Sequence, residues 1–300
     1  MINLKKIGLT ALAGSLVAFS ANAVELGVTG GSEITYTSNG GDLNTTGNRF
    51  GAATSMKFSG SGDVGFGTAT IVRTLRDNQS AASYSSAYTT LDLGDMGVLS
   101  FDTTGGGLVG TAANNGTGNG DGGISGDGGT GSTWDVNVST AVPYVENLTF
   151  SGGFAEKTAT TLKGARQSTN DTTSWTSHLL YDTGPWSMGV RMAANQKGST
   201  NIIAGGNGVA GETATAASVA YNVNDALTVS YAQQDVDFDK VQGILTAPTA
   251  VDQTETSRAF NAAYTMGAAT VRGTVSKATD VAGVVGSKDE HMEISLVLSF

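Results

Sequence analysis

The sequence has 300 residues, no cysteine, and 16 basic against 26 acidic residues, which gives a net charge of −10. An acidic chain of this kind has no basic face to replace the counterions around phosphates, so a nucleic-acid partner is excluded. Its 43 glycines, 3 prolines and 14% charged residues also argue against a charge-rich disordered chain. A helical protein is equally disfavoured, because the Leu, Glu and Lys runs of helices are absent.

The N-terminal segment 1–23 has the pattern of an export signal. Two lysines precede a mostly apolar run, and Ala21 and Ala23 supply the small-x-small cleavage pattern. The run is too short to be a spanning helix. We therefore expect cleavage after Ala23 and a mature chain, 24–300, that forms a single domain. Losing two of the 16 basic residues takes its net charge from −10 to −12.

The mature chain alternates between apolar and small polar residues with a period of two, in about fourteen segments. These expected strands are 25–37, 49–60, 63–75, 84–94, 97–104, 133–142, 147–157, 174–182, 185–195, 213–223, 226–236, 256–266, 268–277 and 290–300. Short turn sequences such as Gly62-Asp63 and Met266-Gly267 alternate along the chain with long polar loops such as 105–132. The pattern predicts an all-β fold, an antiparallel up-and-down transmembrane β-barrel with short periplasmic turns and long extracellular loops.

The two faces of the expected strands differ in the way a lipid bilayer requires. In the last strand Leu296, Leu298 and Phe300 share one face with two further apolar residues. A lipid-facing surface needs such an apolar row, and a water-filled lumen tolerates small polar groups opposite. The alternative is a soluble barrel or sandwich with these rows packed inward, but its solvent face is usually rich in Lys and Glu. Here the polar face is mostly Thr, Ser, Gly, Ala and Asn, which favours an exported barrel in the outer membrane, in contact with the lipid bilayer.

Charged residues in phase with the polar face are candidates for lining the lumen. An Arg or Lys that faces lipid at mid-depth costs about 2–4 kcal/mol, so inward placement is favoured. Basic residues facing an acidic loop set up a field across a pore; the alternative is that they only keep the lumen wet. On this interpretation Arg73→Glu shifts the reversal potential toward cations. The candidates are Arg49, Lys57, Arg73, Arg191, Arg272, Glu33, Asp92, Asp102 and Asp135.

Three stretches carry a resemblance to a known family: the export signal, the turn and strand Leu93 to Phe101, and the terminal residues Leu296 to Phe300. With them the chain resembles the general bacterial porins, in particular the alphaproteobacterial members. The resemblance implies an outer-membrane channel for the passive diffusion of small hydrophilic solutes and ions. It also implies assembly into a homotrimer.

The end of the chain resembles a signal that the family presents to the outer-membrane barrel-assembly machinery, formed here by Phe300 with Leu296 and Leu298. The chain departs from the family pattern at two points. Asp102 and the two threonines after it stand where the family has Gly-Arg. About fourteen strands are expected where many members have sixteen, so sixteen strands and a monomer stay open as alternatives.

The longest connector, 105–132, is rich in glycine and carries Asp121 and Asp127. The resemblance implies that it folds into the barrel and narrows the pore; a plain surface loop is the alternative. Gly-Asp runs ligate Ca²⁺ in solenoid proteins, which leaves a Ca²⁺ site in this loop open. No other cofactor is expected, and the segment lacks the Gly-Lys-Ser/Thr ending of a phosphate loop.

No constellation of catalytic residues stands out, so an enzyme is not expected. His178 and His291 are far apart and neither lies in a metal-ligand spacing. Three alternatives to a general diffusion channel remain: a channel selective for one osmolyte, sugar or amino acid, a plugged structural or adhesive barrel, and a hydrolase that uses a serine with His178. The negative charge predicts a cation preference, although charges in the outer loops are screened from the ion path.

Overall fold

The computed structural model describes residues 25–41, 48–76, 86–104, 135–157, 172–196, 208–241, 253–281 and 285–300. These residues form fourteen strands and one short 3-10 helix, η1 (Gly94–Met96). The strands are β1 (Glu25–Gly41), β2 (Phe50–Asp63), β3 (Thr68–Arg76), β4 (Ser86–Asp92), β5 (Val98–Thr104), β6 (Asp135–Ala141), β7 (Leu148–Lys157), β8 (Thr172–Thr183), β9 (Trp186–Gln196), β10 (Gly208–Asn222), β11 (Leu227–Val241), β12 (Gln253–Met266), β13 (Ala269–Thr279) and β14 (Lys288–Ser299).

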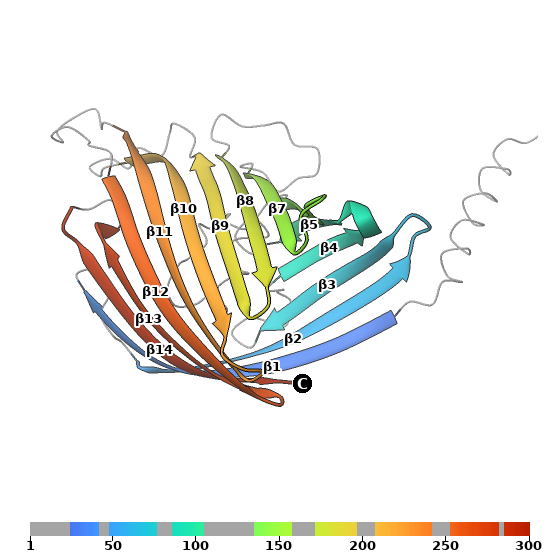
Figure 1. The fold of residues 1–300 in the computed structure, drawn as a ribbon, viewed down its shortest axis with the longest axis horizontal. Helices are drawn as coiled ribbons and strands as arrows, with labels where there is room; N and C mark the ends of the chain where they lie inside the picture. The colour runs from blue at the N-terminus through green and yellow to red at the C-terminus, as the bar shows by residue number, and fades with distance from the viewer. Residues whose placement is uncertain are drawn as a thin grey trace, which may run out of the picture.

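The fourteen strands close into one barrel in which every strand is antiparallel to its neighbours along the chain (Figure 1). This confirms the expected up-and-down barrel, with fourteen strands rather than sixteen in the described residues. The largest boundary differences are of five residues: β3 begins later than expected, at Thr68, whereas β10 and β11 extend further, to Gly208 and Val241. In β10 and β11 the backbone pairing continues beyond the residues that alternate in hydrophobicity. The period-two pattern therefore did not predict the residues added at those two strand ends.

The barrel closes where the two ends of the described chain meet. β1 pairs with β14 from Gly31 opposite Ser299 to Gly41 opposite Asp289. Beyond the last strand residue, the amide of Gly30 donates to the carbonyl of Phe300 at 2.7 Å, and the amide of Phe300 donates back at 3.0 Å. Figure 1 shows the C-terminus lying beside β1. Closure of this kind leaves no strand edge unpaired along the seam.

The turn between β2 and β3 lies further along the chain than the sequence predicted. Gly62 and Asp63 belong to β2, and the turn spans Val64 to Gly67, closed by a hydrogen bond from the Val64 amide to the Gly67 carbonyl at 2.9 Å. The Asp63 carboxylate accepts from the Gly65 amide at 2.7 Å. Gly65 has a φ of +86°, a conformation that glycine adopts without the steric cost of a Cβ. Asp63 therefore caps the turn instead of forming it.

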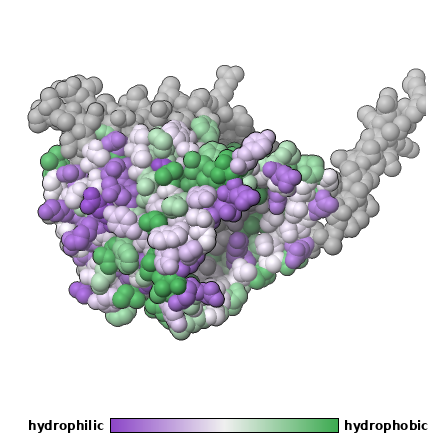
Figure 2. All heavy atoms as spheres, viewed as in Figure 1, coloured by the Kyte–Doolittle hydropathy of each residue, from purple (hydrophilic) through white to green (hydrophobic). Residues whose placement is uncertain are grey.

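Alternate residues of each strand have opposite environments. On β9, Met188, Val190 and Met192 are exposed, whereas Gly189 and Arg191 between them and Ala193 after them are buried. The exposed apolar rows face outward and the small and polar rows face the barrel interior, which is the pattern expected for a barrel in lipid. Figure 2 shows apolar residues spread over one outer face, with hydrophilic residues gathered over the upper parts of β11 and β12. Among the described residues, no helix is long and apolar enough to cross a membrane.

Aromatic side chains lie near both ends of the outer face. Trp186 and Tyr221 pack at 4.5 Å between ring centroids near the short turns. Tyr36 and Phe50 pack edge to face at 5.3 Å near the opposite end, where β1 and β2 approach their long connector. Aromatic residues favour the two interfaces of a membrane, so these pairs mark the limits of the apolar band.

Candidate functional site: the inner wall of the barrel

The inner wall from β6 to β9 is a continuous row of polar side chains. Residues directly opposite on antiparallel strands share a face, and the registers place Ser139, Ser151, His178 and Arg191 next to one another in that order. Ser151 donates to the hydroxyl of Ser139 at 3.0 Å. His178 and Arg191 are both buried. The small serines leave room for the larger imidazole and guanidinium beside them.

Arg191 reaches across a whole strand to find its partner. Its register neighbour on β10 is Ala216, whose own neighbour on β11 is Gln234. The Arg191 guanidinium donates to Gln234 Oε1 at 2.8 Å, and Arg191 is only 3% exposed. The methyl group of Ala216 is small enough for the side chain to pass over it. A buried charge of this kind needs hydrogen-bonding partners, because leaving it unsatisfied is costly.

A second polar row crosses β11 to β13. Asn261 donates to Ser230 at 3.4 Å and accepts from the Thr274 hydroxyl at 2.8 Å. All three side chains are buried on the inward face. The next position in this row is Glu293 on β14, so the polar lining continues to the seam of the barrel.

At the seam, His291 joins β14 to β1. Its Nδ1 lies 2.6 Å from Asn39 Oδ1, and its Nε2 lies 3.8 Å from the Glu293 carboxylate. Glu33 lies further along β1 on the same inward face, opposite Val297. One Glu33 carboxylate oxygen is fully shielded and has no hydrogen-bonding partner among the described residues. This stretch of wall is therefore acidic and incompletely satisfied by the protein itself.

The adjacent wall of β2 and β3 carries cations that solvent reaches. Lys57 lies inward, opposite Thr29 and Thr74, and Arg76 lies inward opposite Ser55. Both are exposed. Ser55 and Lys57 are two residues apart on one face, so Lys57 and Arg76 are diagonal cross-strand neighbours, roughly 7–8 Å apart at the backbone. Glu33 lies one strand away, opposite Ala53. The open wall thus combines two cations with one carboxylate.

These two walls face each other. In the closed order of fourteen strands, β8 lies seven strands from β1 in either direction, and β9 lies seven strands from β2. The wall of His178 and Arg191 is therefore across the barrel from the wall of Glu33 and Lys57. The first is packed and hydrogen-bonded, and the second offers exposed charge. Such an arrangement can hold water and discriminate between solutes by charge.

Comparison with known proteins gives the family. A model of the Gram-negative porins matches residues 8–297. The chain belongs to the Gram-negative porin family. It is therefore an outer-membrane porin, a β-barrel channel for the diffusion of small hydrophilic solutes. No curated protein sequence matches it.

Solved structures agree with this porin in fold. A refined porin structure superposes with a TM-score of 0.58 at 13% identity, covering 92% of this chain and 100% of the other. OmpF of Salmonella typhi in complex with daunomycin gives 0.55 at 12%, covering 92% and 97%. The outer-membrane channel DcaP of Acinetobacter baumannii gives 0.54 at 13%, covering 93% and 98%. At these identities the likeness concerns the fold alone.

Four of the expected lumen residues lie on the inner face of the porin. Glu33, Lys57, Arg191 and Arg272 all point inward by register, with Arg272 half-buried opposite Ser295. They do not form one cluster. Lys57 and Glu33 share the open wall, whereas Arg191 is buried on the opposite one.

Asp92 is also on the inner side by register, but it lies at the last residue of β4. Its carboxylate accepts from the Gly94 amide at 2.9 Å. It thus shapes the short turn into η1 at the mouth of the barrel. The sequence predicted that Asp92 places its charge in the narrow part of the lumen. Its position at the mouth does not support this role.

Two expected lumen residues lie on the outer face instead. Arg73 is opposite Phe58 and Ala87 and shares its row with Ile71 and Leu75, so its side chain leaves the barrel wall outward. The expectation of an inward Arg73 is wrong. It relied on the cost of a charge in lipid, whereas the strand alternation of β3 follows Val72, which is buried inside.

Arg49 precedes β2 and turns toward the outer aromatic pair. Its guanidinium donates to the Tyr36 hydroxyl at 2.8 Å and lies 6.0 Å from the centre of that ring. Tyr36 is an outward residue, in register with Phe50 and Ile294. The inward placement expected for Arg49 is therefore also wrong, because strand parity does not extend to a residue outside the strand.

The remaining expectations fall outside what the structure describes. Asp121 and Asp127, the proposed loop 105–132 with its open Ca²⁺ site, and the cleavage residues Ala21 and Ala23 lie outside the described residues. Asp102 pairs along the backbone with Tyr88 and with Asp135, but neither aspartate side chain is described. Within the described ranges, no group of three or more His, Cys, Asp or Glu side chains is placed to hold a metal ion.

Several residues of the inner face were not predicted from the sequence by charge. Arg76 was overlooked because the phase of β3 had been set by Arg73. Gln234, Asn261 and Thr274 were overlooked because neutral polar residues carry no charge signal. An available signal was their spacing: each shares the phase of the small polar face of its own strand.

Proposed function

We propose that this porin selects solutes by size and charge, through an aqueous path bordered by the open wall of β1 to β3. The observation that supports this most directly is the pair of exposed inward cations, Lys57 and Arg76, on the same wall as Glu33 of the neighbouring strand. Charges of both signs along one wall hold oriented water and admit small polar solutes, whereas apolar solutes would disturb that water and gain no polar contact in return. Transport along this path is passive and has no energy-coupled step.

The proposal includes the absence of catalysis. Nucleophilic chemistry by a serine needs its hydroxyl to donate to a basic imidazole. The serine in register with His178 is Ser151, and its hydroxyl donates to Ser139 instead. The neighbour of His178 on the other side is Arg191, which has no hydroxyl to act as a nucleophile. These contacts argue against the hydrolase alternative.

A salt-gradient measurement in planar bilayers tests the channel and its selectivity together. Folded porin should give stepwise conductance, with a weak cation preference from the net charge of −12 of the mature chain. Folded protein without conductance would overturn the channel and favour a plugged structural barrel. Solute flux that saturates with concentration, or single-channel current blocked by one osmolyte, sugar or amino acid, would replace a general path with a selective one.

We further propose that the porin forms homo-oligomers through the outer face of β2 to β4, as the homotrimer of the family resemblance implies. Arg73 leaves this face beside Phe58 and Ile71, and an Arg facing lipid near mid-depth costs about 2–4 kcal/mol. A neighbouring copy that covers it removes this cost. Light scattering of the detergent-solubilised porin should give an oligomer, which Arg73→Glu dissociates. A monomeric wild type would contradict the proposal.

Two parts of the proposal concern segments outside the described residues. We propose that loop 105–132 narrows the path; shortening it should raise single-channel conductance, and unchanged conductance would argue for a surface loop. We also propose cleavage of segment 1–23 between Ala23 and Val24. The mass of the protein isolated from outer membranes tests this directly.

The end of the chain is proposed as the signal for the barrel-assembly machinery. Leu296 and Leu298 lie in an outward row on β14, and Phe300, directly after the strand, is 80% exposed. The ring is thus available to a partner during assembly and contributes little packing inside the finished barrel.

A further inference from the structure

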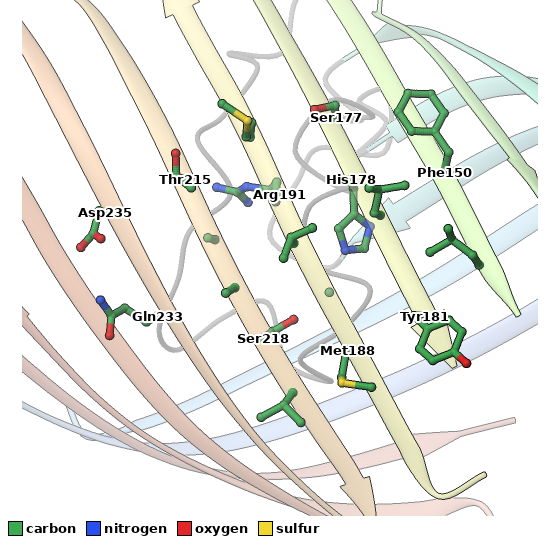
Figure 3. Close-up of a pocket in the computed structure, with 18 of the residues that line it drawn as sticks. Phe150, Ser177, His178, Tyr181, Met188, Arg191, Thr215, Ser218, Gln233 and Asp235 are labelled. Atoms are coloured by element: carbon green, nitrogen blue, oxygen red, sulfur yellow. The ribbon is translucent and has the colours of Figure 1, made fainter. Parts of the chain in front are cut away.

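One arginine of the inner wall finds no partner in the protein. Arg272 of β13 faces inward and is half-buried, directly opposite Ser295 of β14. Within the described ranges, no side chain forms a hydrogen bond or an ion pair with it. On β9, by contrast, Arg191 is satisfied by Gln234 at 2.8 Å, and Figure 3 shows Arg191 on the strand next to that of His178. Arg272 therefore keeps its hydrogen-bond donors available to a solute.

A carboxylate lies two strands from Arg272 on the same inner face. Glu33 of β1 is opposite Val297 of β14, which makes it the diagonal neighbour of Ser295. Diagonal cross-strand neighbours are roughly 7–8 Å apart at the backbone, so both charged side chains can reach the space over the serine. One Glu33 oxygen is shielded and has no partner among the described residues, and no ion pair joins Glu33 to Arg272. Opposite charges thus flank Ser295 without meeting.

Ser295 forms the floor between these two charges. It is 1% exposed, and its hydroxyl has no hydrogen-bonding partner in the described part of the chain. Its neighbours across the strands are Arg272 and Thr35. Glu293 and Val297 lie two residues away on either side along β14. Serine is smaller than all four, so the wall is depressed here, and a polar solute in the depression can bond the unsatisfied hydroxyl, which is costly to leave unpaired.

The charges around this depression disfavour a simple ion. A metal ion needs several acidic or imidazole ligands, and no group of three such side chains is placed to hold one among the described residues. Arg272 also repels a metal ion, whereas Glu33 and the buried Glu293 repel a simple anion. A solute that carries one charge of each sign is attracted at both ends.

We propose that the depression bounded by Arg272, Ser295 and Glu33 binds small zwitterions, of which the α-amino acids are the simplest class. The guanidinium of Arg272 donates a bidentate pair of hydrogen bonds to the carboxylate of the solute. The ammonium of the solute donates to Glu33, and the Ser295 hydroxyl donates to the carboxylate between them. The site rests on the proposed function, because a solute reaches it through the aqueous path. It lies against the wall, so its occupation leaves the rest of the lumen open to other solutes.

Saturation-transfer NMR of L-alanine with the folded porin in deuterated detergent tests the proposal. Two analogues of similar size each lack one charge: L-lactate has no ammonium, and L-alanine amide has no carboxylate. Each should bind roughly tenfold more weakly than L-alanine, because it loses one charge-assisted contact. Binding of either analogue as tightly as L-alanine, or no binding of L-alanine, would overturn the zwitterion site.

Substitutions assign each end of the solute to its side chain. Arg272→Gln and Glu33→Gln should each lower the affinity for L-alanine roughly tenfold. Arg272→Gln should also abolish the preference for L-alanine over its amide, since the group that binds the carboxylate is gone. Arg258→Gln is the matched control, because it removes the same charge from the outer face of β12. An equal loss in Arg258→Gln, or a preference that survives in Arg272→Gln, would overturn the assignment.

The floor of the depression is tested separately. Ser295→Ala removes only the hydroxyl and should weaken L-alanine binding several-fold. Ser257→Ala, at a buried inward serine of β12, is the control and should leave it unchanged. Equal effects of the two would overturn the role of Ser295. Unheated gel mobility checks that every variant is folded.

Conductance in planar bilayers, measured on the same preparations, separates this site from the channel itself. Normal wild-type conductance without L-alanine binding would overturn the zwitterion site and leave the channel standing. L-Alanine binding by folded porin that does not conduct would overturn the channel and support the site alone. Conductance together with binding that needs both charges of the solute is the expected result.

Discussion

The last residue of the chain allows the assembly signal to be separated from barrel stability. Phe300 contributes two main-chain hydrogen bonds to Gly30 and an outward ring. Phe300→Leu keeps both bonds and an apolar side chain of similar volume in contact with lipid. Deleting the residue removes all of these. If the assembly machinery reads the aromatic ring, both variants should lose yield in the outer membrane, although their finished barrels differ in stability.

The difference follows from the contacts. Two hydrogen bonds contribute about 1–3 kcal/mol together, and transfer of the ring out of water contributes about 1.5–3 kcal/mol more. The deletion should therefore lower the free energy of unfolding by about 2.5–6 kcal/mol. Phe300→Leu conserves volume and should cost less than about 1.5 kcal/mol. A larger residue at position 30 would collide with the same ring, because a Cβ on Gly30 would lie 2.5 Å from the Phe300 ring.

Urea titrations of porin refolded into vesicles, followed by tryptophan fluorescence, measure these values. Outer-membrane yield is measured on the same variants in cells. Phe300→Leu that refolds with near wild-type stability and yet accumulates in the periplasm supports a ring-specific signal. Normal assembly of Phe300→Leu would refute it, and equal destabilisation by both variants would refute the assignment of the energy to the main-chain bonds.

Three further outcomes are expected. Lys57→Glu should shift the reversal potential in a salt gradient toward cations, whereas Arg73→Glu should leave it unchanged because Arg73 faces outward; a shift with Arg73→Glu would contradict this register. Gln234→Leu should destabilise the barrel by about 1–3 kcal/mol, since it removes the acceptor of a buried guanidinium, and the outward Gln233→Leu serves as control in urea titrations. Gly67→Ala would place a Cβ 2.3 Å from the Asp92 carbonyl oxygen and should cost about 1–3 kcal/mol, while Gly62→Ala, with no atom within 4 Å, should be neutral in the same assay.

The barrel was predictable because its main determinant is local. Apolar and polar side chains alternate along each strand because one face contacts lipid and the other faces the barrel interior. Residues two positions apart therefore share one environment. Met188, Val190 and Met192 therefore indicated an outward face without any knowledge of their partners. The strand number followed from counting such rows. Turn chemistry was less decisive, as Asp63 shows, because an aspartate can end a strand as a cap.

The inner wall was less predictable because its contacts depend on register between strands. Arg191 finds Gln234 only because Ala216 lies between them, and single-strand patterns contain no such information. Arg73 shows the reverse failure. Its inward placement was predicted from the cost of a charge in lipid, against the alternation of strand β3. A charge on the outer face can also lie in an interface between copies, which is neither lipid nor lumen.

The seam between Asn39 and His291 joins residues 252 positions apart in the chain. No ring can exist until nearly all strands have been made, and contacts of such long range form slowly. Until then the growing sheet has two edge strands with unpaired backbone groups. Each edge strand can pair with the sheet of another copy as readily as with the opposite edge of its own sheet. A chain cut before β14 should consequently not settle into a smaller ring but join others edge to edge. The time spent waiting for the last strand, more than the stability of the finished wall, then sets how much of the protein is lost to aggregation.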